Sequence, residues 1–394
     1  MNIKQSKLHL LIHHHHIVYQ DKDDVIWLSA NIGRWVDAIA SYVGEIGLLF
    51  YQSEDKTPQQ DTPITKSNVR LHSLGPRKTI WQRLLQLNQL SEICAEAGES
   101  ADGLLIRGIT PHQYAIWRQT PVAYKAFFLV GNLEGNRQPF PRSFGELVDI
   151  IARYYRLKGL LRIAKSDTLM LVNSPLVVSE IEQTFNKRAY FVPTNSILES
   201  EFPPPQVRPI KTPLKLLYCG RLDLKKGLRE LLHAIAILNK QGNSCQLDIV
   251  GTKSEPVYSQ LVASVQKLDI TGLIRWHGFV PYGENLFTFY RDADVFILPS
   301  YTEGFPHVIW EAAANCCPVI TTCVGGIPTL IEHEKHALLI PPKDVNAIVI
   351  AIKQLLIDDN LRSQLVINAY HYAKTFAVET CARRLANTLA REWN

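Results

Sequence analysis

The sequence predicts an α/β protein built from two doubly wound domains, each a parallel sheet with helices on its faces. Short apolar runs alternate with longer amphipathic segments along most of the 394 residues, which is the pattern of repeated βαβ units. A proline-rich stretch near residue 205 interrupts this alternation, which then starts again. The length agrees with two or three domains, because one domain usually takes about 100–200 residues.

In the first half of the chain, the apolar runs predict seven strands. They lie at residues 9–19, 46–51, 69–73, 103–107, 122–129, 169–173 and 189–192. Helical periodicity covers residues 79–97 and 143–165, and the polar stretch 53–68, with two prolines, is typical of a surface loop. We assign these elements to a first domain, residues 1–205.

A linker and a second set of strands follow. Phe202 precedes three consecutive prolines, which continue neither a helix nor a central strand, so we expect the linker there. Strands are then expected at residues 214–219, 246–250, 274–279, 295–298, 319–321 and 337–340, in a second domain that spans residues 206–375. Residues 376–394 hold a helix with one apolar stripe, and we expect it to pack back on the first domain.

The composition excludes several classes of protein. Apolar residues make up 46% and charged residues 20%, close to the globular average, so a disordered or coiled-coil chain is not expected. The net charge of +5 is too small over this length to indicate nucleic-acid binding. No apolar run approaches the roughly 20 residues that a membrane-spanning helix needs. Residues 1–7 lack the pattern of a secretory signal.

Cysteine and histidine clusters raise the question of a metal. The seven cysteines form no C-x-x-C pair, which favours reduced thiols and a cytoplasmic location. Cys316, Cys317 and Cys323 are close together, but their spacing fits no zinc pattern, so we expect apolar core cysteines. The run His13 to His16 lies inside the first predicted strand. Neighbouring strand residues point to opposite faces, so these four histidines are not expected to converge on one ion.

The strand end at residue 219 carries an anion-binding pattern. Gly220 and Arg221 follow the strand, and Lys226 and Gly227 open the next helix. Glycine lets the backbone approach a ligand, and both cations lie where a helix N-terminus already favours an anion. Arginine offers a planar fork for phosphate oxygens and lysine a movable charge. Taken alone, the pattern also fits two solvated surface side chains.

The strand end at residue 298 adds two carboxylates. Glu303 lies in the following loop, with Gly304, Phe305 and Pro306 directly after it, and Glu311 lies inside the next helix. Carboxylates in this arrangement can bind sugar hydroxyls, while backbone N–H groups of the loop bind phosphate. The alternative is that Glu303 caps the helix and Glu311 is a surface residue. Gly325 and Gly326 form a third close-approach loop after the next strand.

These stretches together resemble the donor-binding domain of retaining glycosyltransferases of the GT-B fold, in particular glycosyltransferase family 4. The resemblance covers residues 214–373 and is weak before them. It rests on Tyr218-Cys219-Gly220-Arg221 with Lys226-Gly227, on Pro299-Ser300 with Glu303-Gly304-Phe305-Pro306 and Glu311, and on Pro318-Val319-Ile320, Gly325-Gly326-Ile327-Pro328 and Pro341-Pro342-Lys343-Asp344.

The resemblance implies a GT-B fold, with two Rossmann-like domains facing across a cleft. It implies transfer of a sugar from a UDP- or GDP-type donor, with retention and without a metal or other cofactor, in cell-envelope polysaccharide synthesis. Arg221 and Lys226 would bind the diphosphate, Glu303 the sugar hydroxyls and Glu311 the ribose. The backbone of Gly220, Gly304, Phe305 and Pro306 would line the donor, and Gly278 would lie near its base.

The chain departs from the family pattern at several positions. Cys316 and Cys317 stand where the family usually has glycine, which predicts altered packing there. In the first domain, the family has a clear histidine after the strand at 103–107, where this chain has Arg107 at the strand end and then His112. Both are candidates for catalysis or acceptor binding, or else solvated loop residues. The family's double glycine is reduced to Gly33, which either lets the donor approach or is an ordinary turn glycine.

Partners and rival functions remain open at this point. The segment 153–165 carries five basic residues and two tyrosines on a predicted helix, which suits either weak contact with the inner face of an anionic membrane or a solvated face. Three functions fit the pattern: a glycosyltransferase with a saccharide, lipid-linked or small-molecule acceptor; a hydrolase, phosphorylase or epimerase of sugar nucleotides; and a non-catalytic sugar-nucleotide-binding protein.

Overall fold

The computed structural model describes residues 8–76, 87–110, 112–130 and 144–393. Side chains are described for these residues except Leu87 and residues 144–153. The expectations for residues 1–7 and for the first part of the segment 79–97 therefore lie outside the described residues. The chain divides into two compact units, residues 1–196 with 378–394, and residues 197–377.

The first unit has a nine-stranded sheet. Its strands are β1 (His9–Gln20), β2 (Ile26–Leu28), β3 (Glu45–Gln52), β4 (Thr62–Pro63), β5 (Val69–Pro76), β6 (Gly103–Arg107), β7 (Tyr124–Leu129), β8 (Leu169–Val172) and β9 (Ala189–Phe191). The strands β5, β3, β1, β6, β7, β8 and β9 pair in parallel in that order, and β2 and β4 extend β1 in antiparallel pairing. All seven expected strands are confirmed; β2 and β4 are too short to show a periodic pattern.

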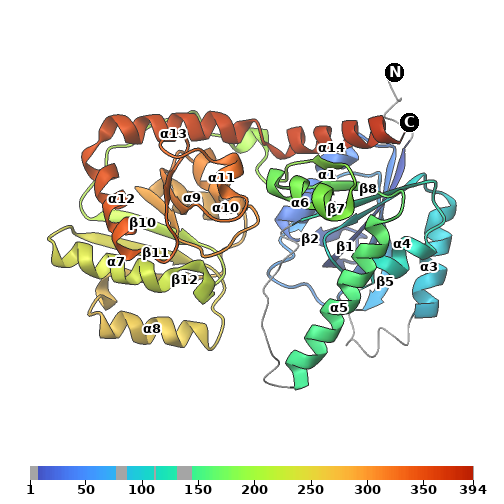
Figure 1. Cartoon of the computed structure of the whole chain (residues 1–394), viewed down its shortest axis with the longest axis horizontal. Coiled ribbons are helices and arrows are strands. Elements are labelled where there is room, and N and C mark those ends of the chain that lie inside the picture. Colours follow the sequence, from blue (N-terminus) through green and yellow to red (C-terminus); the bar gives the residue numbers. More distant parts are fainter. Residues whose placement is uncertain (1–7, 77–86, 111, 131–143, 394) are drawn as a thin grey trace. The chain divides into compact units, whose positions relative to one another are not determined.

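Helices cover this sheet and close its core (Figure 1). They are α1 (Ala30–Ala40), α3 (Leu87–Glu99), α4 (Gln113–Gln119), α5 (Phe144–Ala164), α6 (Pro175–Phe185) and α14 (Val378–Glu392). The helix α14 belongs to this unit although the second unit precedes it in sequence, and it lies along α1. Its buried side chains are those of the expected stripe: Val378, Cys381, Ala382, Leu385, Ala386 and Leu389.

The second unit has a six-stranded parallel sheet. The strands are β10 (Leu214–Cys219), β11 (Cys245–Val250), β12 (Ile274–Gly278), β13 (Val295–Leu298), β14 (Val319–Thr322) and β15 (Leu338–Ile340). Their order is β12-β11-β10-β13-β14-β15. The helices are α7 (Leu228–Lys240), α8 (Val257–Lys267), α9 (Glu284–Asp292), α10 (His307–Ala314), α11 (Ile327–Leu330), α12 (Val345–Ile357) and α13 (Asp359–Lys374). All six expected strands are present.

The boundary between the units lies after Ser196, whereas the sequence suggested residue 205. The proline-rich stretch packs on the second unit instead of bridging freely. Tyr370 of α13 donates a hydrogen bond from its hydroxyl to the Pro203 carbonyl at 2.6 Å. The Phe202 ring lies edge-on to the Tyr370 ring. These contacts tie the stretch to α13.

None of the described helices has the length and apolar character that crossing a lipid bilayer requires.

The docking of α14 gives a testable consequence. Leu385 is fully buried in the first unit, so the Leu385→Ala variant should lose about 2–5 kcal/mol of unfolding free energy. Arg383 is exposed on the same helix, and Arg383→Ala should change stability by less than about 0.5 kcal/mol. Urea denaturation of both variants measures this. Equal stability of the two would contradict the docked helix.

Candidate functional site

The sheet of the second unit reverses its strand order between β10 and β13. From β10 the chain adds β11 and β12 on one side, and then β13, β14 and β15 on the other. All neighbouring strands are parallel, so their carboxyl ends share one edge. Open α/β sheets bind ligands outside the carboxyl ends of strands at such a reversal. The loops after β10 and β13 are therefore the first place to look for a site.

The loop after β10 turns tightly into α7. Asp223 accepts a hydrogen bond from the Lys225 backbone N–H at 2.9 Å, which caps the short 3-10 helix Leu224–Lys226. Gly227 then adopts φ +70, a left-handed conformation that glycine takes without strain, and starts α7. The turn brings Lys226 to the edge of the sheet.

Lys226 forms an ion pair with Glu303 from the loop after β13. The Lys226 Nζ and Glu303 Oε1 atoms are 2.6 Å apart, and the side chains are only 18% and 8% exposed. The alternative for Glu303, a helix cap, is wrong, because Pro306 occupies the N-cap of α10. An ammonium group has three N–H donors, so Lys226 has donors beyond the one that Glu303 uses.

Close backbone contacts hold the loops after β10, β13 and β14 together. A Cβ atom on Gly227 would lie 1.9 Å from the Pro299 carbonyl oxygen, and one on Gly325 would lie 1.8 Å from the Glu303 carbonyl oxygen. The Gly326 N–H donates to the Gly304 carbonyl at 2.8 Å. The sequence analysis expected the Gly325-Gly326 loop to allow a close approach. In the structure, the backbone that approaches it is that of Glu303 and Gly304.

Arg221 lies in the same loop after β10 as Lys226 and has an exposed side chain. Its backbone is held by Tyr218, whose hydroxyl donates to the Arg221 carbonyl at 2.8 Å. Within the described part of the chain, no ion pair involves the Arg221 guanidinium. The edge therefore presents an arginine whose charge is not neutralised by a carboxylate of this unit.

Two more glycines extend the contacts toward β12. A Cβ atom on Gly251 would lie 1.8 Å from the Gly220 carbonyl oxygen, and the Gly251 N–H donates to the Gly278 carbonyl at 2.8 Å. Gly278 itself has φ +72. The sequence analysis named Gly220 and Gly278 but missed Gly251. Gly251 could have been found from the sequence, because it directly follows an apolar run, as Gly220 does.

Glu311 is buried inside α10 and is 6% exposed, so the alternative of a surface residue is wrong. The Tyr290 hydroxyl of α9 donates to Glu311 Oε2 at 2.7 Å. Burial raises the pKa of Tyr290 well above its usual value, so the phenol stays protonated and remains a donor. Burial likewise raises the pKa of the nearby Cys219 thiol to about 12. The Glu311 carboxylate thus has a protonated phenol and a protonated thiol near it.

Phe305 and Pro306 lie between the two carboxylates. The Phe305 side chain is buried, and its ring centroid is 4.8 Å from that of Trp310. This packing fixes the backbone that connects Glu303 to α10. Pro306 takes the N-cap position of α10.

Arg107 and His112 are the candidates of the first unit, and neither is an exposed side chain. Arg107 ends β6, is 3% exposed and has its guanidinium 4.6 Å from the Trp35 ring centroid. Burial lowers the pKa of Arg107 to about 10, so it keeps its charge at neutral pH. The solvated-loop reading of Arg107 is therefore wrong. His112 is half-buried, and its Nδ1 lies 2.5 Å from the Tyr51 hydroxyl.

Gly33 is neither a loop nor a turn glycine. It lies in the first turn of α1, and a Cβ atom there would be 3.1 Å from the Thr62 side chain of β4. Its small size serves the packing of α1 on β4. Its place near the N-terminus of α1 leaves the expected approach to a donor as a prediction.

The histidine run departs from strand alternation. His13 is buried, with Nδ1 2.7 Å from the Leu49 carbonyl and Nε2 3.0 Å from the Thr110 hydroxyl. Burial lowers the pKa of His13 to about 4 and that of His14 well below 6.5. The four histidines do not all converge, because His13 is held apart by these contacts, but three of them do despite the expected strand alternation. Ligand nitrogens of His14, His15 and His16 all lie within 4.8 Å of one another.

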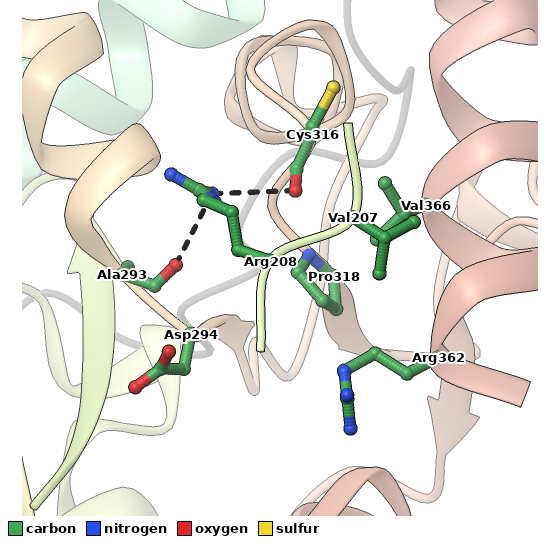
Figure 2. Close-up of a pocket in the computed structure, with 8 residues that line it drawn as sticks. All are labelled: Val207, Arg208, Ala293, Asp294, Cys316, Pro318, Arg362 and Val366. Carbon is green, nitrogen blue, oxygen red and sulfur yellow. Dashed lines mark hydrogen bonds between the residues drawn. The ribbon is translucent and has the colours of Figure 1, made fainter. Parts of the chain in front are cut away.

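The cysteine cluster forms no comparable group within the described residues. Cys316 and Cys317 are buried and Cys323 is exposed. Cys316 has φ +56, a conformation that favours glycine, which explains why a family pattern would place glycine there. Its carbonyl accepts a hydrogen bond from Arg208 at 3.4 Å beside a cavity of about 10 Å³ (Figure 2). This cavity has room for about one water molecule, so it is a packing feature.

Comparison with known proteins agrees with this fold. The family model described as "Glycosyl transferases group 1" matches residues 201–372, which hold the whole Lys226–Glu303 cluster. The putative colanic acid biosynthesis glycosyltransferase WcaL of Escherichia coli K12 is 34% identical over 155 residues, 38% of this chain and 37% of that protein. The O-antigen chain mannosyltransferase B of Escherichia coli is 30% identical over 246 residues, 59% of this chain and 63% of that protein.

The chain spans less than half the length of the first curated relatives that it matches. Solved structures are similar over nearly the whole chain. Sucrose-phosphate synthase from Thermosynechococcus elongatus has a TM-score of 0.73 at 17% identity and covers 98% of this chain and 99% of its own. Anabaena HepE in complex with UDP-glucose has a TM-score of 0.72 at 15% identity, and the match covers 98% of this chain and 100% of the HepE chain. The fold is GT-B, two Rossmann-like units with parallel sheets.

The contact between the Gly325 loop and Glu303 can be tested directly. In Gly325→Ala, the new Cβ collides with the Glu303 carbonyl and the residue keeps φ +55, so we expect a loss of about 1–3 kcal/mol of unfolding free energy. Gly272→Ala is the matched control, because a Cβ there meets nothing within 4 Å. Urea denaturation of both variants measures the difference between their unfolding free energies. If Gly325→Ala is as stable as the control, the loops are not in contact as described.

Proposed function

We propose that this chain is a retaining glycosyltransferase that uses a nucleotide-diphosphate sugar of the UDP or GDP type. The observation that carries the proposal is the Lys226–Glu303 pair at the strand-order reversal, with the exposed Arg221 in the same loop as Lys226. The family match over residues 201–372 supports it, since that segment contains all three residues. The acceptor would be a saccharide, a lipid-linked saccharide or a small molecule.

Arg221 and Lys226 would bind the diphosphate and stabilise its charge during transfer. Breaking the bond between sugar and phosphate leaves negative charge on the phosphate oxygens. Fixed cations aimed at that charge lower the barrier, and loss of one such contact typically costs about 10²–10³ in rate. Lys226 is positioned for this by Glu303, which holds the ammonium group 2.6 Å away at the edge of the sheet.

Glu303 and Glu311 would bind hydroxyl groups of the donor. Glu303 lies with Lys226 at the carboxyl end of β13, where a sugar next to the diphosphate would reach it. Glu311 lies deeper in α10 and accepts from Tyr290, which orients its carboxylate for a ribose hydroxyl. The backbone of Gly220, Gly304, Phe305 and Pro306 would line the donor, and Gly278 would lie near its base.

The configuration of the anomeric carbon would be retained by a front-face reaction. The bond between the anomeric carbon and the phosphate oxygen breaks, and the acceptor oxygen bonds to the same face of that carbon. The acceptor proton passes to the departing phosphate. Neither a protein nucleophile nor a metal is needed for this step. The contribution of the chain is electrostatic, through Arg221 and Lys226.

The relatives suggest the biological class of product. They are named for colanic acid, amylovoran and O-antigen, and HepE is a structural neighbour in complexes with UDP and UDP-glucose. We therefore propose a role in cell-envelope polysaccharide synthesis in the cytoplasm, with a UDP-sugar as the first donor to test. Arg107 and His112 are the first-unit candidates for acceptor binding.

Part of α5 is suited to peripheral membrane contact. Tyr154, Tyr155 and Leu161 are 59%, 66% and 44% exposed; Lys158 of α5 and Lys165, the residue directly after α5, are exposed as well. Aromatic, aliphatic and basic side chains on one helix favour the surface of an anionic bilayer. We propose that this segment brings the chain to a lipid-linked acceptor.

Substitution of Arg221 tests the proposed function. Because Arg221 is exposed, Arg221→Ala should fold normally, whereas removal of Lys226 would take the ammonium group from the buried Glu303 carboxylate and destabilise the fold. The unmodified chain should gain about 2.7 kcal/mol of stability at 100 times the dissociation constant of its donor. A thermal-shift screen of UDP-, GDP- and ADP-sugars measures this.

We expect Arg221→Ala to lose the thermal shift and to slow transfer of labelled sugar by about 10²–10³. Arg275→Ala is the control, since Arg275 is an exposed arginine on β12. Product analysis separates the rival functions. Label on an added acceptor supports the proposal, turnover without acceptor indicates a hydrolase or epimerase, and binding without turnover indicates a binding protein. Unchanged binding in Arg221→Ala would reject the site itself.

The membrane proposal has its own test. The double variant Lys158→Glu with Lys165→Glu should float less with anionic liposomes at low salt, because each lysine near such a surface contributes about 1 kcal/mol. The control reverses two exposed lysines of the second unit, Lys240→Glu with Lys267→Glu. Flotation that does not depend on anionic lipid, or that both double variants lose equally, would end this proposal.

A further inference from the structure

An irregularity in β1 gathers three histidines at the edge of the first sheet. His13 pairs with Leu49 and Ile17 pairs with Tyr51, so four steps along β1 correspond to two along β3. Extra residues in one strand break the ladder locally and redirect side chains. His14, His15 and His16 lie within this bulge. They are thereby released from the alternation that would send His15 to the face opposite the other two.

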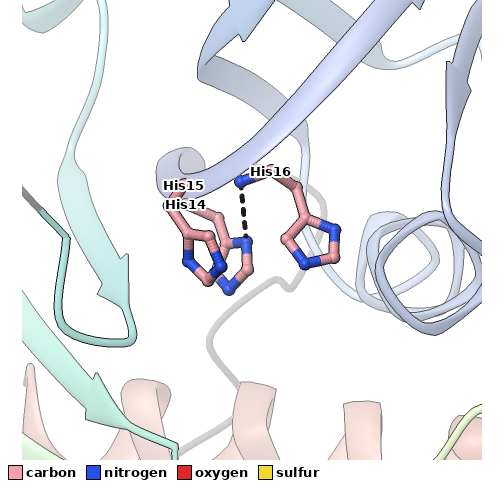
Figure 3. A group of neighbouring side chains, drawn as sticks. All are labelled: His14, His15 and His16. Atoms are coloured by element: carbon pink, nitrogen blue, oxygen red, sulfur yellow. Dashed lines mark hydrogen bonds between the residues drawn. The ribbon is translucent and has the colours of Figure 1, made fainter. Parts of the chain in front are cut away.

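The three imidazole rings converge (Figure 3). The ring centroids are 4.2 Å apart for His14 and His15, 4.6 Å for His14 and His16, and 5.0 Å for His15 and His16. Their candidate ligand nitrogens lie within 4.8 Å of one another. Around one Zn²⁺, nitrogens lie about 3.3 Å apart, since Zn–N bonds are about 2.0–2.1 Å. His15 is exposed, so rotation of its side chain can close this difference.

His16 is already oriented for metal binding. Its Nδ1 lies 2.8 Å from the Ser29 hydroxyl, and Ser29 donates its own hydrogen to Asn31 Oδ1 at 2.7 Å. Ser29 therefore accepts from His16 Nδ1–H, which leaves the lone pair on Nε2. Metal-ligating histidines usually have such an outer partner on the second ring nitrogen. Nδ1 of the buried His14 accepts the His16 backbone N–H at 3.2 Å, a long contact that a metal bond would replace.

The surroundings of the cluster favour one class of ion. The donors are three imidazoles without a carboxylate, a set that suits Zn²⁺, Cu²⁺, Ni²⁺ or Co²⁺ and not Mg²⁺ or Ca²⁺, which prefer oxygen. The buried guanidinium of Arg107 acts on His14 and opposes added positive charge, so an anion is favoured as a further ligand. His15 and His16 also line a pocket of about 520 Å³, together with Ser29, Ser53, Thr57 and Gln60.

We propose that His14, His15 and His16 form a binding site for a borderline transition-metal ion such as Zn²⁺, with a fourth position open to this pocket. Three protein ligands with an open position is the arrangement of metal sites that exchange a ligand. The strand order of the first sheet also reverses between β1 and β6, at the edge where the bulge lies. The histidines belong to the first unit and the Lys226–Glu303 cluster to the second, and the metal proposal does not depend on the proposed transfer reaction.

The test measures metal binding by the full chain, prepared without a polyhistidine tag and stripped with chelator. Titration with Co²⁺ should give saturable binding of one ion per chain with the absorption of an imidazole-bound ion, and Zn²⁺ should displace it. His15→Ala, at an exposed position, should fold normally and lose affinity. The loss should exceed the roughly 10–100-fold that removal of an outer partner costs. Ser29→Ala should lower the affinity for Co²⁺ by about 10–100-fold, because it removes the outer partner of His16.

His9→Gln is the matched control, because His9 lies on the same strand outside the cluster. It should bind Co²⁺ as the unmodified chain does, and thermal unfolding should confirm that all variants are folded. Absence of saturable Co²⁺ binding would overturn the proposal. So would binding that His15→Ala leaves unchanged, or a loss that His9→Gln shares.

Discussion

The site in the second unit depends on close approach between the backbones of neighbouring loops. Gly227 lies against the Pro299 carbonyl and Gly325 against the Glu303 carbonyl, at distances where any side chain would collide. These contacts join the loops after β10, β13 and β14. Lys226 and Glu303 consequently meet at 2.6 Å with little exposure to water. A pair this buried is retained only where its geometry offsets the loss of hydration, and the glycine contacts supply that geometry.

The two units use one topology for different chemistry. Each sheet reverses its strand order once, between β1 and β6 in the first unit and between β10 and β13 in the second. The second unit places two cations and two carboxylates beside its reversal, whereas the first places imidazoles and the buried Arg107 beside its own. A common arrangement of strands thus fixes where functional side chains gather, and the loops fix what they do.

The regular elements were predictable because burial imposes a period on the sequence. Apolar runs marked every long strand, and the stripe on α14 named the residues that the structure buries. The strand-end loops after residues 219 and 298 were predictable for the same reason. The errors fall on residues whose surroundings come from elsewhere in the chain. Arg107 is covered by Trp35 of α1, Gly33 packs on Thr62, and Glu311 is enclosed with Tyr290 of α9.

The sequence by itself determined the order of strands and helices and the residue types at each strand end. The tertiary structure decided which of those residues meet. Lys226 and Glu303 are 77 positions apart, and only the pairing of β10 with β13 brings them together. The bulge in β1 likewise depends on its register with β3. Parallel strands that are neighbours in space are joined by long connections, so local periodicity carries no record of these contacts.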